Sequence, residues 1–281
     1  MGLQPRCIVL DFDGTFTDVE QEAVPYVTAY RADLVRRYGR AVEARWDAVW
    51  EEVGRDPEQG WNVGGLVVAP AVSDPYIRST VTAETILVEE GLEPDAEARR
   101  ELLGALYRTH YRAAGVVFRP DARATLERLL QGPWRLFVVS NSETDAVREK
   151  LQRLGAEGLE RLTVLGGARK YVVTPAEPSD ARFEALPERL AVEGLRRPLY
   201  PRRGHYYGVL RDIWRETDSG PEQTLVCGDI YELDLLLPGS LGAQVHLLAR
   251  ATTPAFERRA VEELHGGRVG DRLQSLLERL G

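Results

Sequence analysis

Hydrophobic positions along the 281-residue chain fall into short runs separated by segments of helical periodicity. Five runs have the length and β-branched content of buried strands: "CIVL", "RLFVVS", "RLTVL", "TLVCGD" and "AQVHLLA". Most are separated by segments with helical spacing, such as "DARATLERLLQ", "TDAVREKLQRLG" and "YYGVLRDIWRET". This alternation predicts βαβ units and therefore an α/β fold with a mostly parallel sheet.

The region between the first and second runs departs from this alternation. From about Val19 to Gly115 the pattern is mainly helical, and the segment is too long for a single crossover. We therefore expect a core formed by residues 1–18 and 116–281 and a helical module formed by residues 19–115. Trp46 and Trp50, four residues apart, are expected in the core of this helical module.

Two irregular stretches interrupt the predicted elements. "GWNVGGLVVAPAVSDP" (Gly60 to Pro75) breaks the helical module with three glycines and two prolines, and we expect a loop there. Whether such a loop faces a ligand or only connects two helices is open at this point. Residues 171–201 are rich in proline and arginine, and they predict an insertion in the core that adds a hairpin or a flap at the sheet edge.

Polar residues follow four of the predicted strands. In an open α/β sheet, ligands bind beyond the carboxyl ends of the strands, so these residues are expected on one rim. Each one alone has a structural explanation as a turn former, a helix cap or a solvated side chain. Together, in this chain order, they predict a polar site: Asp11, Asp13, Gly14 and Thr15, then Ser140 and Asn141, then Lys170, then Asp229 and Asp234.

The charge balance narrows the class of partner. Acidic residues outnumber basic ones by 44 to 36, and the net charge is −8, which argues against a nucleic-acid partner but leaves room for a local pocket for a small anion. The sequence contains no run of about 18 apolar residues and no secretory signal at its start, so we expect no membrane association and a cytoplasmic location. Cys7 and Cys227 lie in predicted strands and are expected to be buried core residues.

Clustered carboxylates raise one another's pKa unless a cation lies among them. Carboxylate oxygens suit magnesium better than zinc or copper. The four histidines, at positions 110, 205, 246 and 265, show no metal-ligand spacing. A magnesium ion beside a hydroxyl and a lysine is suited to binding a phosphoryl group.

"DFDGTFTD", "VVSN" and "CGDIYELD", in this order after predicted strands, resemble motifs one, two and four of the haloacid dehalogenase superfamily. The resemblance covers nearly the whole chain. It implies a three-layer Rossmann-like core, and residues 19–115 resemble the helical cap of the first cap class of that superfamily.

The resemblance also implies roles for the residues of the rim. Asp11 would be the nucleophile that forms an aspartyl-phosphate, and Asp13 would be the general acid and then the general base. Phosphate would be bound by Ser140 with Asn141, Thr15 and Gly14. The Mg²⁺ ligands would be Asp11, the carbonyl of Asp13, Asp229 and Asp234.

The third motif of the superfamily, a lysine or arginine often followed by proline, has no clear counterpart. Lys170 directly follows the third predicted strand, and Arg203 lies at the start of the helix before the fourth. We expect Lys170 to fill this role, with Arg203 as the alternative.

A carboxylate at Asp13 separates subclasses of the superfamily, because the dehalogenases lack one there and a phosphate ester needs a protonated leaving group. We therefore expect a Mg²⁺-dependent phosphatase for a small phosphorylated metabolite, with the cap closing over the core. Two alternatives stay open at this point. A phosphomutase would share every core residue, and a non-catalytic scaffold would use the cap to bind another protein.

Overall fold

The computed structural model describes residues 4–111 and 114–280. These residues form two compact units. The first, here called the core unit, contains the chain up to Asp18 and again from Phe118, and the second, here called the helical unit, spans Val19–Val117. The chain passes from the core unit to the helical unit between Asp18 and Val19, and it returns to the core unit at Phe118.

The core unit is built on a six-stranded parallel sheet with the order β5-β4-β1-β6-β7-β8. β1 lies between β4 and β6, so the direction of strand order reverses at β1, where open α/β sheets bind ligands. The five strands expected from the apolar runs are present. Their bounds are Cys7–Leu10 (β1), Arg135–Val139 (β4), Leu162–Leu165 (β5), Thr224–Gly228 (β6) and Gln244–Leu248 (β7).

The sixth strand, β8 (Gly267–Gly270), was not predicted from the sequence. Its residues, "GRVG", contain one apolar side chain between two glycines, so they give no strand signal of their own. β8 forms because β7 offers it a parallel partner at the sheet edge. The predicted fold class is therefore correct, and the sheet is one strand wider than expected.

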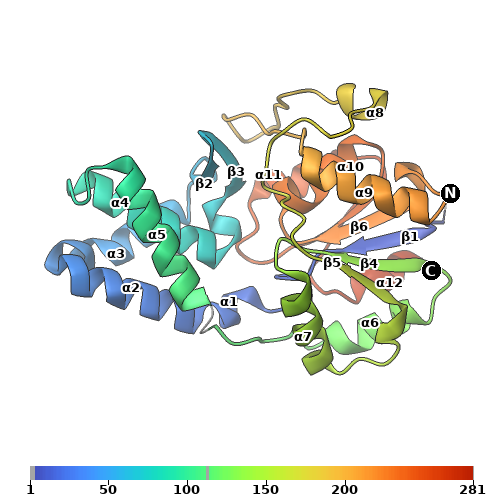
Figure 1. Cartoon of the computed structure of the whole chain (residues 1–281), viewed down its shortest axis with the longest axis horizontal. Coiled ribbons are helices and arrows are strands. Elements are labelled where there is room, and N and C mark those ends of the chain that lie inside the picture. Colours follow the sequence, from blue (N-terminus) through green and yellow to red (C-terminus); the bar gives the residue numbers. More distant parts are fainter. Residues whose placement is uncertain (1–3, 112–113, 281) are drawn as a thin grey trace. The chain divides into compact units, whose positions relative to one another are not determined.

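Helices cover both faces of this sheet, as Figure 1 shows. Cys7 and Val9 of β1 pack on one side in a cluster with residues of α9 and α11, while Ile8 and Leu10 pack on the other with residues of α6 and α7. Burial on both faces explains why the strands read as unbroken apolar runs. The helices are α6 (Ala122–Leu130), α7 (Thr144–Leu154), α9 (Gly204–Glu216), α10 (Leu236–Ser240), α11 (Ala255–Glu263) and α12 (Ser275–Leu280), with 3₁₀ turns at Leu159–Arg161 and Pro221–Gln223.

The helical unit has an apolar and aromatic core of its own. Trp46 is buried in this core, and its ring stacks on that of Trp50 with 6.3 Å between centroids. Asp74 caps α4 by accepting hydrogen bonds from the amides of Tyr76 and Ile77. The helices are α1 (Val19–Glu22), α2 (Val24–Tyr38), α3 (Arg40–Val53), α4 (Pro75–Glu89) and α5 (Ala96–Tyr111).

We expected a loop over Gly60 to Pro75, and this prediction is wrong for most of that stretch. β2 (Gly60–Val63) and β3 (Leu66–Pro70) form an antiparallel hairpin, followed by a 3₁₀ turn at Ala71–Ser73. The hairpin turns at Gly64 and Gly65, which have φ values of +60° and +85°. Two consecutive residues with positive φ suit the tight turn of a two-residue hairpin, so the glycine pair was a hairpin signal.

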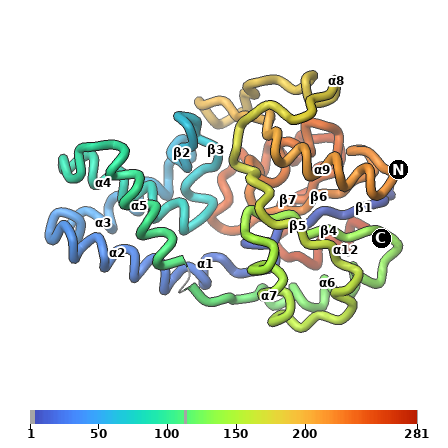
Figure 2. The backbone as a smooth tube through the Cα atoms, viewed as in Figure 1, coloured from blue at the N-terminus to red at the C-terminus, as the bar shows by residue number. Residues whose placement is uncertain are grey.

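The insertion expected at residues 171–201 lies in the long connection between β5 and α9. Its described residues contain the short helix α8 (Ala181–Glu184) and isolated bridges such as Leu190–Leu199, so the expected hairpin is reduced to a single bridge. Figure 2 shows the segment passing over α9. Phe183 packs on Tyr207 of α9 with 4.9 Å between ring centroids, and the Tyr207 hydroxyl donates to Asp180. The segment is therefore part of the packed core unit.

We predict that Phe183→Ala lowers the free energy of unfolding by about 3 kcal/mol, because it removes a buried ring from a packed interface. Glu184→Ala, on the same helix and exposed, is the matched control and should change it by less than about 0.5 kcal/mol. Urea unfolding followed by fluorescence would measure both. Equal, small effects of the two changes would show that the segment does not contribute to the core.

Candidate active site

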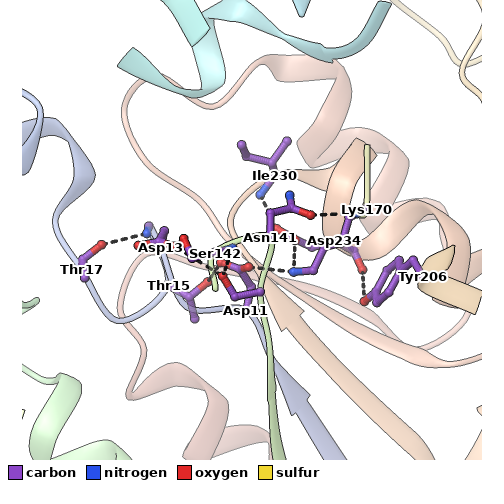
Figure 3. A network of polar contacts seen from close by, with 12 residues as sticks. Asp11, Asp13, Thr15, Thr17, Asn141, Ser142, Lys170, Tyr206, Ile230 and Asp234 are labelled. Atoms are coloured by element: carbon purple, nitrogen blue, oxygen red, sulfur yellow. Dashed lines mark hydrogen bonds and ion pairs between the residues drawn. The ribbon is translucent and has the colours of Figure 1, made fainter. Parts of the chain in front are cut away.

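The site begins where β1 and β6 end side by side. Asp11 and Asp229 directly follow these strands, and the amide of Asp11 donates to the carbonyl of Cys227 at 2.8 Å. Asp234 joins them, and each of the three offers a carboxylate oxygen within 4.8 Å of the others. All three are buried. The acids that follow β1 and β6 therefore lie close together, and Figure 3 shows two of them, Asp11 and Asp234.

Asp234 reaches the cluster through a π-helical turn at Tyr231–Leu235. Its Oδ2 accepts from the amide of Ile230 at 3.1 Å, and its backbone carbonyl accepts from the Tyr206 hydroxyl at 3.0 Å. A side chain at Gly228 would place its Cβ 2.4 Å from the Cβ of Asp234. Glycine at position 228 is therefore a requirement for this carboxylate to approach the strand end.

Glycine is also required at position 14, in the turn that follows the neighbouring strand β1. Its φ is +83°, and an added Cβ would lie 2.1 Å from Oδ2 of Asp229. Its amide donates to the Thr17 hydroxyl at 3.0 Å, and its carbonyl accepts two bonds from the Arg119 guanidinium at 2.9 and 3.1 Å. Hydrogen bonds on both sides therefore fix the turn after Asp13. The absence of a side chain at Gly14 leaves room for the carboxylate of Asp229.

Lys170 lies among the carboxylates. Its Nζ donates to Oδ1 of Asp11 at 2.7 Å and to Oδ1 of Asp234 at 2.8 Å, and its side chain is 1% exposed. Its amide donates to the side-chain oxygen of Asn141 at 2.7 Å, which fixes the loop that carries it (Figure 3). Burial alone would lower the pKa of Lys170, but Asp11 and Asp234 outweigh burial and raise it, so the ammonium is charged.

Arg203, the alternative to Lys170, is also buried but makes different contacts. Its guanidinium donates to the carbonyls of Lys170 and Tyr200, each at 2.8 Å. Burial lowers the pKa of Arg203 to about 10, while Glu232 opposes that shift. Of the two basic candidates, Lys170 is the one that the structure brings to Asp11, and Arg203 supports the backbone of the lysine.

Asp13 stands apart from the three clustered carboxylates. Its Oδ2 accepts from the hydroxyls of Ser142 at 2.7 Å and Ser140 at 3.4 Å, and its Oδ1 accepts from Nζ of Lys150 at 2.8 Å. The side chain of Asp13 is therefore not one of the clustered metal-ligating groups, and its backbone carbonyl stays a predicted ligand. The two acids of the first motif have separate sets of partners.

Two further residues of the predicted set, Thr15 and Ser140, make hydrogen bonds within the site. The Thr15 hydroxyl donates to Oδ2 of Asp11 at 3.3 Å. The Ser140 hydroxyl accepts from the amide of Ser142 at 3.0 Å, so it shapes the turn after β4. Neither Ser140 nor Asn141 is the N-cap of α7, because that position is Glu143. The helix-cap explanation of these two residues is therefore wrong.

Arg250, which was not identified from the sequence, forms an ion pair with Asp229. Its guanidinium donates to Oδ2 of Asp229 at 2.7 Å, and the two side chains are 9% and 4% exposed. Arg250 lies two residues after β7, directly after the fifth predicted strand, so extending the search of strand ends to that strand would have found it. Among the described residues, Lys170 and Arg250 both form ion pairs with the clustered carboxylates.

Lys150 is another site residue that was not identified from the sequence, although the sequence contained a signal for it. The chain has 36 basic residues, of which only Lys150 and Lys170 are lysines. Each lysine contacts one of the two aspartates of the first motif. In a chain that otherwise uses arginine, an isolated lysine indicates a position where a compact ammonium is required.

The electrostatics of the cluster call for a further cation. Burial raises the pKa of Asp11 well above its usual range, Asp234 raises it further, Lys170 lowers it, and Asp229 raises it again. Three buried carboxylates with hard oxygen donors fit Mg²⁺ better than a soft metal. Asp11, Asp229 and Asp234 are the side chains that would hold such an ion.

The family model of haloacid dehalogenase-like hydrolases matches residues 5–196 of the chain. The chain belongs to this hydrolase family. No curated protein matches the chain in sequence.

Solved structures share the fold of this hydrolase over nearly its whole length. The HAD-hydrolase YfnB from Bacillus subtilis, solved bound to magnesium, is 15% identical with a TM-score of 0.56, covering 99% of this chain and 100% of its own. A haloacid dehalogenase-like hydrolase from Bacteroides fragilis is 18% identical with a TM-score of 0.54, covering 97% and 100%. A predicted phosphoglycolate phosphatase from Haemophilus somnus is 14% identical with a TM-score of 0.54, covering 98% of both chains.

At these identities the similarity establishes the Rossmann-like core fold of the family and leaves the substrate class undecided. Among the described residues, no helix is both long and apolar enough to cross a membrane.

We predict that Gly14→Ala weakens Mg²⁺ binding about tenfold or more, because its Cβ would overlap Asp229. Gly155→Ala is the matched control, since Gly155 also has a positive φ, of +67°, but its Cβ would meet no atom within 4 Å. Both changes should cost about 1 kcal/mol of stability from backbone strain. Isothermal titration would measure the affinities. Equal affinities in the two variants would show that Gly14 is needed only for its turn.

Proposed function

We propose that this hydrolase is a Mg²⁺-dependent phosphomonoester hydrolase for a small phosphorylated metabolite. The observation that supports it best is the separate environment of the two aspartates of the first motif. Asp11 faces Lys170 and the other clustered carboxylates, while Asp13 is held by Ser142 and Lys150. A nucleophile and a proton-transfer group are thus available two residues apart.

In the first half-reaction, a carboxylate oxygen of Asp11 attacks phosphorus, and the bond between phosphorus and the ester oxygen breaks. Asp13 gives its proton to the leaving oxygen, which departs as an alcohol. The product on the protein is an aspartyl-phosphate at Asp11. Lys170 supports this step because its ammonium, 2.7 Å from Asp11, offsets charge on the nucleophile and the phosphoryl oxygens.

In the second half-reaction, a water molecule attacks phosphorus of the aspartyl-phosphate. Asp13, now a carboxylate, takes a proton from this water, and the bond between phosphorus and the Asp11 oxygen breaks. Inorganic phosphate leaves and Asp11 is regenerated. When bound, Mg²⁺ supplies charge compensation for the carboxylates and the phosphoryl group. Ser140, Asn141, Thr15 and Gly14 are proposed to bind phosphoryl oxygens, and the helical unit is proposed to be the cap.

The presence of Asp13 favours a phosphatase over a dehalogenase. A halide leaves as an anion and needs no proton, whereas an alkoxide leaving group does. Solved structures of related fold include both phosphatases and dehalogenases, so fold alone does not decide between them. The magnesium bound to YfnB and the acidic cluster here agree with a metal-dependent phosphatase.

The proposal is tested by assaying an aryl phosphate and a 2-haloacid with and without Mg²⁺. We expect phosphate release that requires Mg²⁺, is lost in Asp11→Asn, and is accompanied by no halide release. Halide release by the wild type would overturn the phosphatase assignment. Recovery of an isomerised sugar phosphate instead of free phosphate would indicate a mutase. Absence of both activities with a panel of phosphate esters would favour a binding protein.

We predict that Lys170→Met lowers kcat/KM for the aryl phosphate by about 10²–10³-fold, because it removes the charge beside the nucleophile. Arg203→Lys keeps a positive charge behind the lysine and is expected to lose less than tenfold. Steady-state kinetics with circular dichroism as a check of folding would measure both. A larger loss for the Arg203 variant would assign the role of the third motif to Arg203.

We predict that Lys150→Met lowers kcat about tenfold or more through Asp13, within the range ascribed to general acid–base catalysis. The loss should be larger for an alkyl phosphate than for an aryl phosphate, because a poor leaving group depends more on the proton. Lys150→Arg should restore much of the activity. Equal losses for the two substrates would indicate that Lys150 supports folding or substrate binding and does not position Asp13.

A further inference from the structure

The insertion at residues 171–201 supplies a buried cation to the turn that carries Asp234. Arg197 donates through Nη1 to Oε2 of Glu232 at 2.9 Å and through Nη2 to Oε1 of the same carboxylate. The side chain of Glu232 is 0% exposed and that of Arg197 is 12% exposed. Glu232 lies in the π-helical turn Tyr231–Leu235, two residues before Asp234. One ion pair therefore joins the insertion to a turn of the candidate metal site.

The physics of a buried ion pair indicates that this one has a role besides stability. Taking two opposite charges out of water costs about as much free energy as their attraction returns, so apolar side chains often stabilise a core equally well. The two parallel hydrogen bonds between a guanidinium and a carboxylate, however, fix the orientation of both groups. Apolar contacts have no such direction. The pair of Arg197 and Glu232 is therefore suited to holding one turn in one place.

This turn is anchored by two segments of the core unit. The Tyr206 hydroxyl, from α9, donates to the backbone carbonyl of Asp234 at 3.0 Å, and Arg197, from the insertion, binds Glu232. π-Helical turns are rare and occur often at functional sites, so a turn of this kind depends on contacts with its surroundings. With both anchors in place, Oδ1 of Asp234 accepts from Nζ of Lys170 at 2.8 Å and the carboxylate lies in the cluster.

Packing of the insertion fixes the backbone on both sides of Arg197. Leu190 and Leu199 exchange two backbone hydrogen bonds, at 2.9 and 2.8 Å, and these bonds close the segment that contains Arg197. Leu199 is buried in the same apolar cluster as Tyr231, and Leu190 packs against this cluster. The guanidinium of Arg197 therefore reaches the turn from a segment that is itself packed against the core unit.

We propose that Arg197 is a positioning residue for the metal site, which acts through Glu232 on the turn that carries Asp234. This inference rests on the metal site of the proposed function. It gives the insertion a role in metal binding in addition to its packing on α9.

The test compares Mg²⁺ affinity with stability, both measured on the full chain without substrate. Arg197→Met should bind Mg²⁺ about tenfold more weakly than the wild type in isothermal titration, because the turn that carries Asp234 loses an anchor. It should also unfold at a lower temperature, because Glu232 stays buried without its cation. Arg197→Lys keeps the charge but not the paired hydrogen bonds, and its loss of affinity should be smaller.

A double variant separates the position of the turn from its stability. Arg197→Met combined with Glu232→Met replaces the ion pair by apolar side chains, which should bring the unfolding temperature back towards that of the wild type. Its Mg²⁺ affinity should stay about tenfold weaker, because apolar contacts do not fix the orientation of the turn. Recovery of wild-type affinity together with stability would overturn the inference, since the pair would then be only structural.

Two exposed residues of the insertion provide matched controls. Arg196→Met makes the same change at the neighbouring position, and Glu193→Met removes an acid whose ion pair with Arg259 is exposed. Both variants should keep the Mg²⁺ affinity and the unfolding temperature of the wild type. An equal loss of affinity in Arg196→Met and Arg197→Met would overturn the inference, because it would show an effect of net charge alone.

The remaining outcomes separate this inference from the proposed function. Wild-type affinity in a folded Arg197→Met would overturn the inference and leave the proposed metal site in place. If Arg197→Met does not fold, the double variant decides in its stead. Absence of Mg²⁺ binding by the wild type would overturn the proposed metal site and this inference with it.

Discussion

The structure depends on how three buried carboxylates are compensated at the ends of β1 and β6. Asp11, Asp229 and Asp234 are buried, and each brings an oxygen within 4.8 Å of the others. Such an arrangement is unstable unless positive charge is built in beside it. Lys170 forms ion pairs with Asp11 and Asp234, and Arg250 forms one with Asp229. The loops after β5 and β7 are therefore held in place by electrostatics as much as by packing.

The topology of the sheet brings these loops together. The order of strands reverses at β1, so the chain can deliver side chains to the end of β1 from both directions along the sheet. Glycines at positions 14 and 228 remove the side chains that would block Asp229 and Asp234. Arg119 donates to the carbonyl of Gly14, and Arg203 donates to the carbonyl of Lys170. Hydrogen bonds to the backbone of these loops, and the absence of a side chain at the two glycines, therefore support the site.

Much of the fold was predictable because burial on both faces leaves a plain signal in the sequence. β1, β4 and β6 read as apolar runs, and the polar residues that follow them were identified from position alone. β8 and the β2–β3 hairpin were missed. β8 has a single apolar side chain between two glycines, and the glycine pair of the hairpin turn was interpreted as a loop.

The missed site residues share another property. Arg119 comes from a segment whose approach to the site depends on tertiary packing, and one arginine among many carries little signal of its own. Arg250 follows a predicted strand, but the search of strand ends stopped at the fourth. The choice between Lys170 and Arg203 also needed coordinates, since both are buried and both lie near the same loop. Lys150 is different, because the scarcity of lysine in the chain pointed to it without any structure.

That scarcity has a practical consequence for spectroscopy. Because Lys150 and Lys170 are the only lysines in the chain, isotopic labelling of this amino acid alone would yield two side-chain signals. One ammonium adjoins Asp11 and the other adjoins Asp13. Nuclear magnetic resonance could therefore follow each aspartate separately through its neighbour, with no resonance from the rest of the molecule to be subtracted.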